Sequence, residues 1–458
     1  MRCRWLVVLV PSVILGQGCH VALTRDLPPS GTQAVYLSWQ RDPTTTMTVH
    51  WLTRPEHGSD ALTWTPRGEE SWQRALGAHR PVPHSDHLLH TVELTELTPG
   101  GDYRFRIAGD RRDYAFRTMP ADAGEPITFV VGGDLYREGF DQRMYVQAAR
   151  RDPMFALIGG DIVYDNGEPA RVSRWFHWLN AWEEFMVTSD GRLIPMIVTI
   201  GNHEVRGEYD RTPAEAPFFY SLFAWPGEQG CGVLDFGGYM SIVALDSGHT
   251  HPIGGAQTEW LQRTLADRSD VEHVFAVYHV PAYPSVRAFD GGKSPLIRQH
   301  WVPLFDRWSV DVVYENHDHA YKRTPLIRGG QVDRGGILYL GDGAWGVAPR
   351  NVHDPRTTWY LERAESVKHV IVTTIHGRTR RHEAVNELGE VFDSYPETRG
   401  GTVERAKRVR PWAGVAPRAT KLRSVDRATQ TQSAIRRTPV TTAPGRPSSS
   451  TARNPAGP

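Results

Sequence analysis

Five short apolar runs in the middle of the chain each end in a group of polar residues. The runs occupy positions 127–131, 154–158, 194–200, 274–278 and 310–314. Short continuous runs rich in Val and Ile predict strands buried on both faces, as in a layered α/β domain. Helical patterns at 140–151, 172–186, 257–266 and 300–308 separate the strands, and Asp141 is a candidate N-cap of the first helix. Further strands are predicted at 240–245, 337–340 and 368–375.

Residues 34–118 follow a different pattern, in which apolar and polar positions alternate over short segments. Alternating segments lie at 35–39, 47–52, 90–94, 103–107 and 114–118, with Pro, Gly and Asp between them. Short strands at this spacing predict a β-sandwich, with Trp39 and Trp51 as core residues. Residues 119–126 are the predicted linker to the α/β domain.

The polar residues that follow the five apolar runs are potential metal ligands. In open α/β sheets, ligand-binding groups lie on loops beyond the carboxyl ends of the strands. We therefore expect one rim of the domain to bring together Asp134, Asp161, Tyr164, Asn202, His203, His279, His317 and His319. These oxygen and imidazole donors include no thiolate, so they favour a hard or borderline metal over a Cys-based structural zinc site.

The order of these motifs resembles that of the metallophosphoesterases. The motifs are Gly-Asp at 133–134, Gly-Asp-Ile-Val-Tyr at 160–164, Gly-Asn-His-Glu at 201–204, His279, and His-Asp-His at 317–319. Tyr164 points to the purple acid phosphatase branch, and the resemblance spans roughly residues 35–382. It implies a fibronectin type III-like β-sandwich at about 30–120 and a calcineurin-like metallophosphoesterase domain at about 125–385, with two mixed β-sheets flanked by helices.

By this resemblance the centre holds two metal ions, with Asp161 as the bridging carboxylate. Fe³⁺ would bind Asp134, Asp161, Tyr164 and His319. A divalent ion (Fe, Zn or Mn) would bind Asp161, Asn202, His279 and His317. Two such metals can hold a phosphate ester and activate a water molecule for attack. The His-Asp-His spacing predicts that His317 and His319 lie on the same side of an extended loop, since alternate side chains share a face.

The resemblance also assigns roles around the metals. His203 would contact the substrate and stabilise or protonate the leaving oxygen, together with Asn202 as a substrate contact. Glu204 would fix a histidine from behind. Asn316 replaces the Gly that is usual before His317, and we expect it to tolerate an unusual backbone angle. Arg287 and Lys293 stand where related enzymes carry additional histidines, so they either bind the phosphate or are solvated loop charges. The loop 205–217 has no assigned role.

The resemblance predicts hydrolysis of phosphate monoesters by a metal-activated hydroxide. One alternative is a phosphodiesterase or nucleotide hydrolase on the same centre, because the motifs specify metals and not the ester. A more distant alternative is an inactive protein that binds a surface through its β module. The presence of Asp134, Asp161, Asn202, His279, His317 and His319 argues against it.

Composition and the chain ends add an expectation about location. The 458 residues suggest two or three domains, and a formal net charge of zero does not favour nucleic acid as a partner. Residues 1–19 resemble a secretory signal, and Leu-Gly-Gln-Gly-Cys at 15–19 resembles a lipobox that would acylate Cys19 and attach the protein to a membrane. We expect an exported protein (periplasmic, secreted or lipid-anchored) with a disordered basic tail at 396–458. With three Cys, no disulfide framework is expected, and the sequence leaves the oligomeric state open.

Overall fold

The computed structural model describes residues 31–136, 142–224 and 230–396, and the statements below concern these residues. The predicted leader with Cys19, the candidate cap Asp141 and the predicted tail from residue 397 onward lie outside them.

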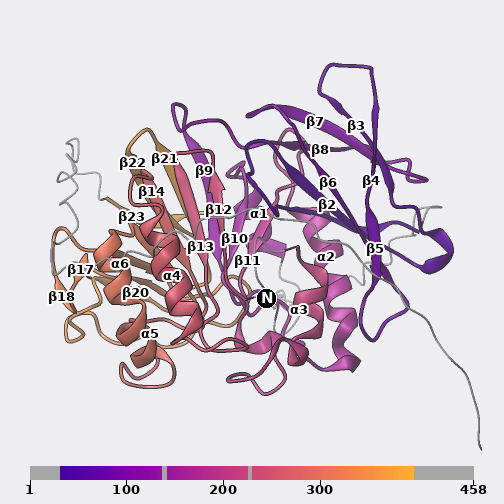
Figure 1. The fold of residues 1–458 in the computed structure, drawn as a ribbon. Helices are drawn as coiled ribbons and strands as arrows, with labels where there is room; N and C mark the ends of the chain where they lie inside the picture. Colours follow the sequence, from indigo (N-terminus) through magenta and orange to yellow (C-terminus); the bar gives the residue numbers. More distant parts are fainter. Residues whose placement is uncertain (1–30, 137–141, 225–229, 397–458) are drawn as a thin grey trace, which may run out of the picture. The chain divides into compact units, whose positions relative to one another are not determined.

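The N-terminal domain consists of two four-stranded antiparallel sheets (Figure 1). One sheet has the order β1 (Gln33–Ser38), β2 (Met47–Thr53), β6 (Leu88–Leu94) and β5 (Ala78–Pro81). The other has the order β4 (Gln73–Leu76), β3 (Ala61–Pro66), β7 (Asp102–Ile107) and β8 (Tyr114–Arg117). The five alternating segments are confirmed as strands, and Trp39 and Trp51 are buried in the core as predicted.

The second domain contains two mixed sheets. The six-stranded sheet has the order β11 (Met196–Val198), β10 (Ala156–Ile158), β9 (Ile127–Gly132), β21 (His369–His376), β22 (Thr379–Asn386) and β23 (Val391–Tyr395). The seven-stranded sheet has the order β12 (Gly232–Phe236), β13 (Met240–Ala244), β14 (His273–Val277), β15 (Val312–Glu315), β19 (Leu338–Gly341), β16 (Tyr321–Arg323) and β20 (Arg363–Glu365). A small hairpin is formed by β17 (Ile327–Arg328) and β18 (Gln331–Val332).

Alternate residues of each strand face different layers. Phe129 of β9 and Phe275 of β14 belong to the apolar cluster between the two sheets, and the centres of their rings lie 5.6 Å apart. Val130, on the other face of β9, packs with the helices α1 (Gln142–Ala149), α2 (Val172–Phe185) and α3 (Pro217–Leu222). The outer face of the second sheet is covered by α4 (Ala256–Ala266), α5 (Ser294–His300) and α6 (Val302–Trp308) (Figure 1). The result is the predicted pair of mixed sheets flanked by helices.

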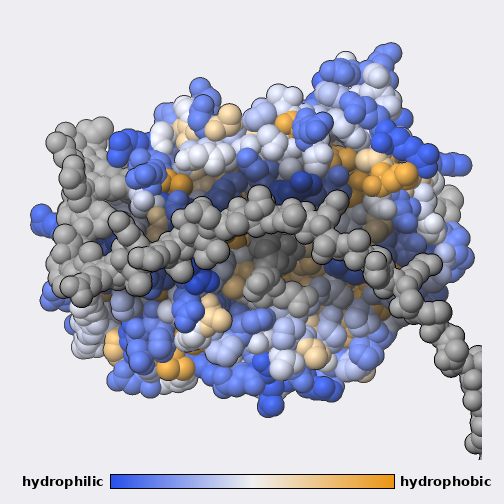
Figure 2. Space-filling model, in the orientation of Figure 1, coloured by the Kyte–Doolittle hydropathy of each residue, from blue (hydrophilic) through white to orange (hydrophobic). Residues whose placement is uncertain are grey.

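Parallel pairing brings the strand ends that precede the motifs to a common edge. β9, β10 and β11 run parallel, as do β13, β14 and β15. The six-stranded sheet continues through β23 to Tyr395, past the domain end expected near residue 385. Among the described residues visible in Figure 2, hydrophilic residues predominate and apolar residues form small separate patches.

Candidate metal centre

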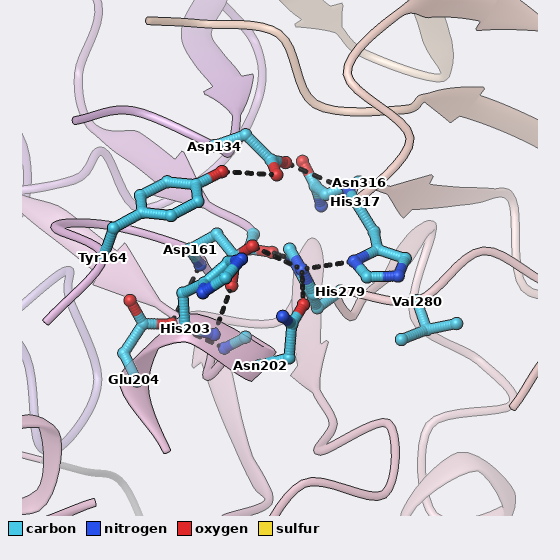
Figure 3. A network of polar contacts seen from close by, with 12 residues as sticks. Asp134, Asp161, Tyr164, Asn202, His203, Glu204, His279, Val280, Asn316 and His317 are labelled. Atoms are coloured by element: carbon cyan, nitrogen blue, oxygen red, sulfur yellow. Dashed lines mark hydrogen bonds and ion pairs between the residues drawn. The ribbon is translucent and has the colours of Figure 1, made fainter. Parts of the chain in front are cut away.

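The predicted ligands converge at the carboxyl ends of the strands (Figure 3). Asp134 follows β9, Asp161 follows β10, and Asn202 and His203 lie in the 3₁₀ turn after β11. His279 follows β14, and His317 and His319 follow β15. The structure therefore brings together residues that are up to 185 positions apart in the sequence.

Asp134, Asp161 and His319 form one group of donors, whose ligand atoms all lie within 4.8 Å of one another. His319 Nε2 is 3.0 Å from Asp134 Oδ1. The Tyr164 hydroxyl joins this group, 3.2 Å from both Asp134 Oδ1 and His319 Nε2. These are the four residues predicted for the first metal.

Asp161, His279 and His317 form the second group, again within 4.8 Å. His279 Nε2 lies 3.2 Å from Asp161 Oδ2 and 3.2 Å from Asn202 Oδ1, and His317 Nδ1 lies 3.1 Å from His279 Nε2. Asp161 thus belongs to both groups, which is the position that a bridging carboxylate requires.

The donor atoms are arranged as ligands for cations. Asp161 Oδ2 is buried without a well-aligned hydrogen-bond donor among the described residues, so its charge has to be balanced by a bound cation or by a proton on His279, whose Nε2 lies 3.2 Å away. His279 Nδ1 lies 2.8 Å from the Gly159 carbonyl, to which its N–H donates, so Nε2 can offer a lone pair to the centre. The set of carboxylate, phenol, amide and imidazole donors therefore fits two metal ions.

Protonation links these groups when no cation is present. Burial acts to lower the pKa of His279, but the Asp161 charge raises it to about 9. Burial acts to raise the pKa of Asp161, but His279 and its neighbours hold it well below the usual value. A proton on His279 thus balances the Asp161 charge, and a metal ion has to displace that proton.

Left-handed backbone angles set the direction of several donors. The φ angles are 60° at Asp134, 52° at Asp161, 55° at Tyr164, 78° at His317 and 57° at His319. Non-glycine residues rarely adopt such angles, and they cluster at functional sites. The prediction of an extended His-Asp-His loop was wrong: positive φ angles at both histidines bend the segment, and each histidine reaches a different group of donors.

Asn316 fills space over neighbouring glycines, whereas we expected it to adopt an unusual backbone angle. It is not among the left-handed residues, so no tolerance of an unusual angle is needed at this position. Its carboxamide instead fills the space over two glycines, and a Cβ at Gly159 would lie 1.8 Å from Asn316 Nδ2. The same amide donates to the Tyr278 carbonyl at 3.1 Å.

Glu204 also acts differently from the expectation, which was that it fixes a histidine. Its buried carboxylate accepts backbone N–H groups from Asp161 (2.9 Å), Ile162 (2.6 Å) and Gly201 (2.8 Å). It therefore holds together the loops that follow β10 and β11, and it sets the backbone of Asp161.

Two supporting residues escaped the sequence analysis. Asn166 Oδ1 accepts from His203 Nδ1 at 2.6 Å and so orients the imidazole. Tyr209, in the unassigned loop 205–217, places its hydroxyl 3.3 Å from His317 Nε2. A lone Asn or Tyr in a loop carries no signal in a single sequence; Asn166 is distinguished only by lying two positions after Tyr164.

Arg287 and Lys293 both have acidic partners. Arg287 Nη1 donates to the His317 carbonyl at 2.7 Å and forms an ion pair with Asp318. Lys293 Nζ lies 2.6 Å from Asp210 Oδ1 and 5.6 Å from the centre of the Tyr209 ring. Substrate binding by Arg287 and Lys293 stays a prediction. Through its ion pair with Asp210, Lys293 connects the loop 205–217 to the segment before α5.

Comparisons with known proteins agree with this architecture. Residues 32–118 match the family model of the purple acid phosphatase N-terminal domain, and residues 123–321 match that of the calcineurin-like phosphoesterases. The fold and site define a metallophosphoesterase. More narrowly, the chain belongs to the purple acid phosphatase-like metallophosphoesterases with an N-terminal β domain, which confirms the predicted family and fold class.

Individual relatives are distant. An uncharacterized protein of Mycobacterium tuberculosis is 26% identical over 346 residues, covering 66% of this chain and 63% of that protein. A probable purple acid phosphatase of Arabidopsis thaliana is 25% identical over 379 residues, covering 76% of this chain and 84% of that protein. The structure of a purple acid phosphatase from yellow lupin seeds has a similar fold, with a TM-score of 0.67, 16% identity, and coverage of 80% of this chain and 74% of that one. The chain thus spans less than two thirds of the mycobacterial relative.

Proposed function

We propose that this protein hydrolyses phosphate monoesters at a centre of two metal ions. The observation that carries the proposal is the shared position of Asp161 in two groups of donors, each with its ligand atoms within 4.8 Å. When bound, two cations at such a site would neutralise the ester oxygens and lower the pKa of a bound water. Asp134, Asp161, Tyr164 and His319 would hold Fe³⁺, and Asp161, Asn202, His279 and His317 a divalent Fe, Zn or Mn ion.

The protein's own residues would handle the substrate and the leaving group. His203 lies beside the donors, with its ring centre 4.4 Å from that of Tyr164, and its Nδ1 is engaged by Asn166. Its Nε2 side is therefore the one assigned to the leaving oxygen. Burial lowers the pKa of His203, so the protonated imidazole that could donate to this oxygen is favoured by acidic pH. The Asp210–Lys293 ion pair joins the loop 205–217 to the segment before α5.

The decisive experiment compares two Asp→Asn variants at opposite ends of the same strand. Asp161 and Asp152 both have positive φ angles (52° and 45°), and Asn tolerates such angles, so the two substitutions impose equal backbone demands. We expect the kcat of Asp161→Asn for p-nitrophenyl phosphate to fall by roughly 1000-fold or more. The variant should also lose bound metal, since removal of the bridging carboxylate takes a ligand away from both ions. Asp152→Asn should retain both. Equal activity of the two variants, or faster hydrolysis of a bis-ester than of the monoester by the wild type, would contradict the proposal.

The identity of the metals is tested by metal analysis with an absorption spectrum. A phenolate bound to Fe³⁺ gives a visible charge-transfer band, so we expect a coloured protein containing iron. Tyr164→Phe removes the hydroxyl that lies 3.2 Å from Asp134 Oδ1, and it should abolish the band while leaving weaker hydrolysis. A colourless wild-type protein that holds only zinc and is active would refute the Fe³⁺ assignment without affecting the dinuclear site.

Export remains a proposal that rests on residues 1–19. None of the helices among the described residues is long and apolar enough to span a membrane. The predicted attachment through Cys19 is tested by mass spectrometry of the mature N-terminus, which would show a lipid on Cys19 or a cleaved leader.

A further inference from the structure

A third group of metal-binding side chains lies in the N-terminal β domain. It consists of Asp60, His79 and His90, and one donor atom of each lies within 4.8 Å of the others. None of the three belongs to the centre at the strand ends of the second domain. The proposed phosphatase activity therefore does not account for this group.

The group sits where the chain crosses from one sheet of the sandwich to the other. His79 of β5 and His90 of β6 are directly paired across the antiparallel ladder, so their side chains lie next to each other on one face. Asp60 immediately precedes β3, in the opposite sheet. Gly77 connects β4 to β5, and its N–H donates to the Asp60 carbonyl at 2.9 Å. The three side chains thus join two sheets at their edge.

The surrounding residues hold the ring of His90 in a fixed orientation. Its Nδ1 lies 2.7 Å from Asp60 Oδ1, and its Nε2 lies 2.8 Å from Thr53 Oγ1. The ring stacks on Trp51 at 5.0 Å with an interplanar angle of 4°. A second ring nitrogen that is hydrogen-bonded to a neighbouring group is the usual arrangement of a metal-binding histidine.

One side of the group is open to solvent. The His90 side chain is fully buried, whereas Asp60 is 30% and His79 44% exposed. His79 Nδ1 lies 2.9 Å from both oxygens of Asp60. This arrangement leaves room on the solvent side for a water molecule as a further ligand.

The charge states suit metal binding near neutral pH. Partial burial acts to raise the pKa of Asp60, but hydrogen bonds with His79 and His90 lower it below its usual value. Burial lowers the pKa of His90. An ionised carboxylate and a neutral imidazole are the forms that bind metals.

We propose that Asp60, His79 and His90 bind one Zn²⁺ ion, which ties the two sheets of the N-terminal domain together. Imidazole nitrogens and carboxylate oxygens are both zinc ligands, and a water molecule would complete the four-coordinate geometry that zinc prefers. Ca²⁺ and Mg²⁺ prefer sites made of oxygen ligands, so the two imidazoles select against them. The four residues of β5 are all exposed, so side-chain packing contributes little to the stability of this strand. The ion would attach β5 to the opposite sheet through Asp60.

The first test counts zinc in the full-length chain after removal of metals with a chelator. The matched pair is His79→Ala and His84→Ala: both histidines are exposed and lie in the same β5–β6 hairpin region, but only His79 belongs to the group. We expect His79→Ala to bind one Zn²⁺ fewer than the wild type in equilibrium dialysis, and His84→Ala to bind the same number. Equal zinc content of the two variants would overturn the proposal.

The second test separates this ion from the metals of the proposed active centre. In a chain carrying Asp161→Asn, added Zn²⁺ should still raise the Tm, and His79→Ala should abolish that rise. Asp60→Asn keeps an oxygen that accepts hydrogen bonds but is a poor ligand, so it should preserve the zinc-free Tm and lose the zinc-dependent rise. Thr53→Val should weaken zinc binding about tenfold. If Zn²⁺ leaves the Tm of the Asp161→Asn chain unchanged, the three residues form a hydrogen-bonded group only and the proposal fails.

Discussion

The imidazole of His203 depends on Asn166 for its orientation. The side-chain contact of 2.6 Å is reinforced by the backbone, because the Asn166 N–H donates to the His203 carbonyl at 2.8 Å. Asn166 itself has a φ of 56°, which Asn and Gly adopt more readily than other residues. One residue thus fixes both the ring nitrogen of His203 and the chain direction beside the proposed metal ligands.

This arrangement predicts a specific loss in Asn166→Gly. Glycine keeps the left-handed backbone but removes the acceptor for His203 Nδ1, so the ring is free to rotate. We expect kcat for p-nitrophenyl phosphate to fall 10- to 100-fold with metal content unchanged, in the range typical of lost supporting contacts. Asn166→Asp retains an acceptor oxygen and should keep most of the activity. A kcat of Asn166→Gly within twofold of the wild type would show that His203 needs no such support.

For single residues, the sequence was informative where a potential metal ligand directly follows a predicted strand. Asp134, Asp161 and His279 each follow an apolar run, so a strand end and a ligand can be predicted together. Tyr209 and Asn166 could not be found, since their partners His317 and His203 are selected by the folded loops and not by local spacing. The role of Glu204 was missed for the same reason, because its partners are backbone N–H groups that have no sequence signature.

Glycines in the loops between elements make room for the proposed metal ligands. Gly343 follows β19, has a φ of 64°, and a Cβ there would lie 1.9 Å from Asp134 Oδ2. The turn between β17 and β18 provides a comparison, because Gly329 has a φ of 59° but no atom lies within 4 Å of its Cβ position. The two glycines share the same backbone demand and differ in their contact with a ligand.

We therefore expect Gly343→Ala to displace Asp134 and to lower metal content and kcat by at least 100-fold. Gly329→Ala should lose only the roughly 1 kcal/mol that a left-handed alanine costs, with normal metal content. Metal analysis and thermal unfolding of both variants provide the measurement. Similar metal content in the two would mean that the Asp134 loop can move aside.

The sequence failed to predict some strands with weak burial, and it also missed β3, β12 and β16, which are largely buried. The strands β4 and β5 are short and largely exposed, so no apolar pattern marks them. β22 carries Thr-Arg-Arg-His-Glu at its start and is recognised only through its pairing with β21. Buried strands such as β9 and β14 were found because every one of their apolar positions contacts a packed layer.

Across the whole molecule, the two domains share one apolar cluster and several polar contacts. The ring of Trp39 in the N-terminal domain packs against the ring of Phe155, with the two ring centres 6.0 Å apart. Glu183 of α2 accepts the Val35 N–H at 2.9 Å and forms an ion pair with Arg112. Contacts of this kind couple the stability of the domains, so a group buried in either domain affects the unfolding of both.

Buried histidines give this coupled structure a pH dependence. Burial lowers the pKa of His50 in β2 and of His382 in β22 to about 3. In the unfolded chain these groups titrate near 6.5, so between about pH 6.5 and pH 3 the unfolded state binds protons that the folded state does not. The free energy of unfolding therefore falls as the pH falls through this range, by up to about 1.4 kcal/mol per pH unit for each group.

His50→Gln should remove one of these contributions. Glutamine can still form hydrogen bonds with Ser38 and Thr91, the partners of the His50 ring, but it does not titrate. In urea unfolding at pH 7 and pH 5, we expect the loss of stability at pH 5 to be smaller by about 2 kcal/mol in His50→Gln than in the wild type. His57→Gln, at an exposed position, should leave the difference unchanged. If the free energy of unfolding falls equally between pH 7 and pH 5 in His50→Gln and in the wild type, His50 is protonated in the folded state. If the expected difference is found, buried neutral histidines limit the acidity at which this protein stays folded.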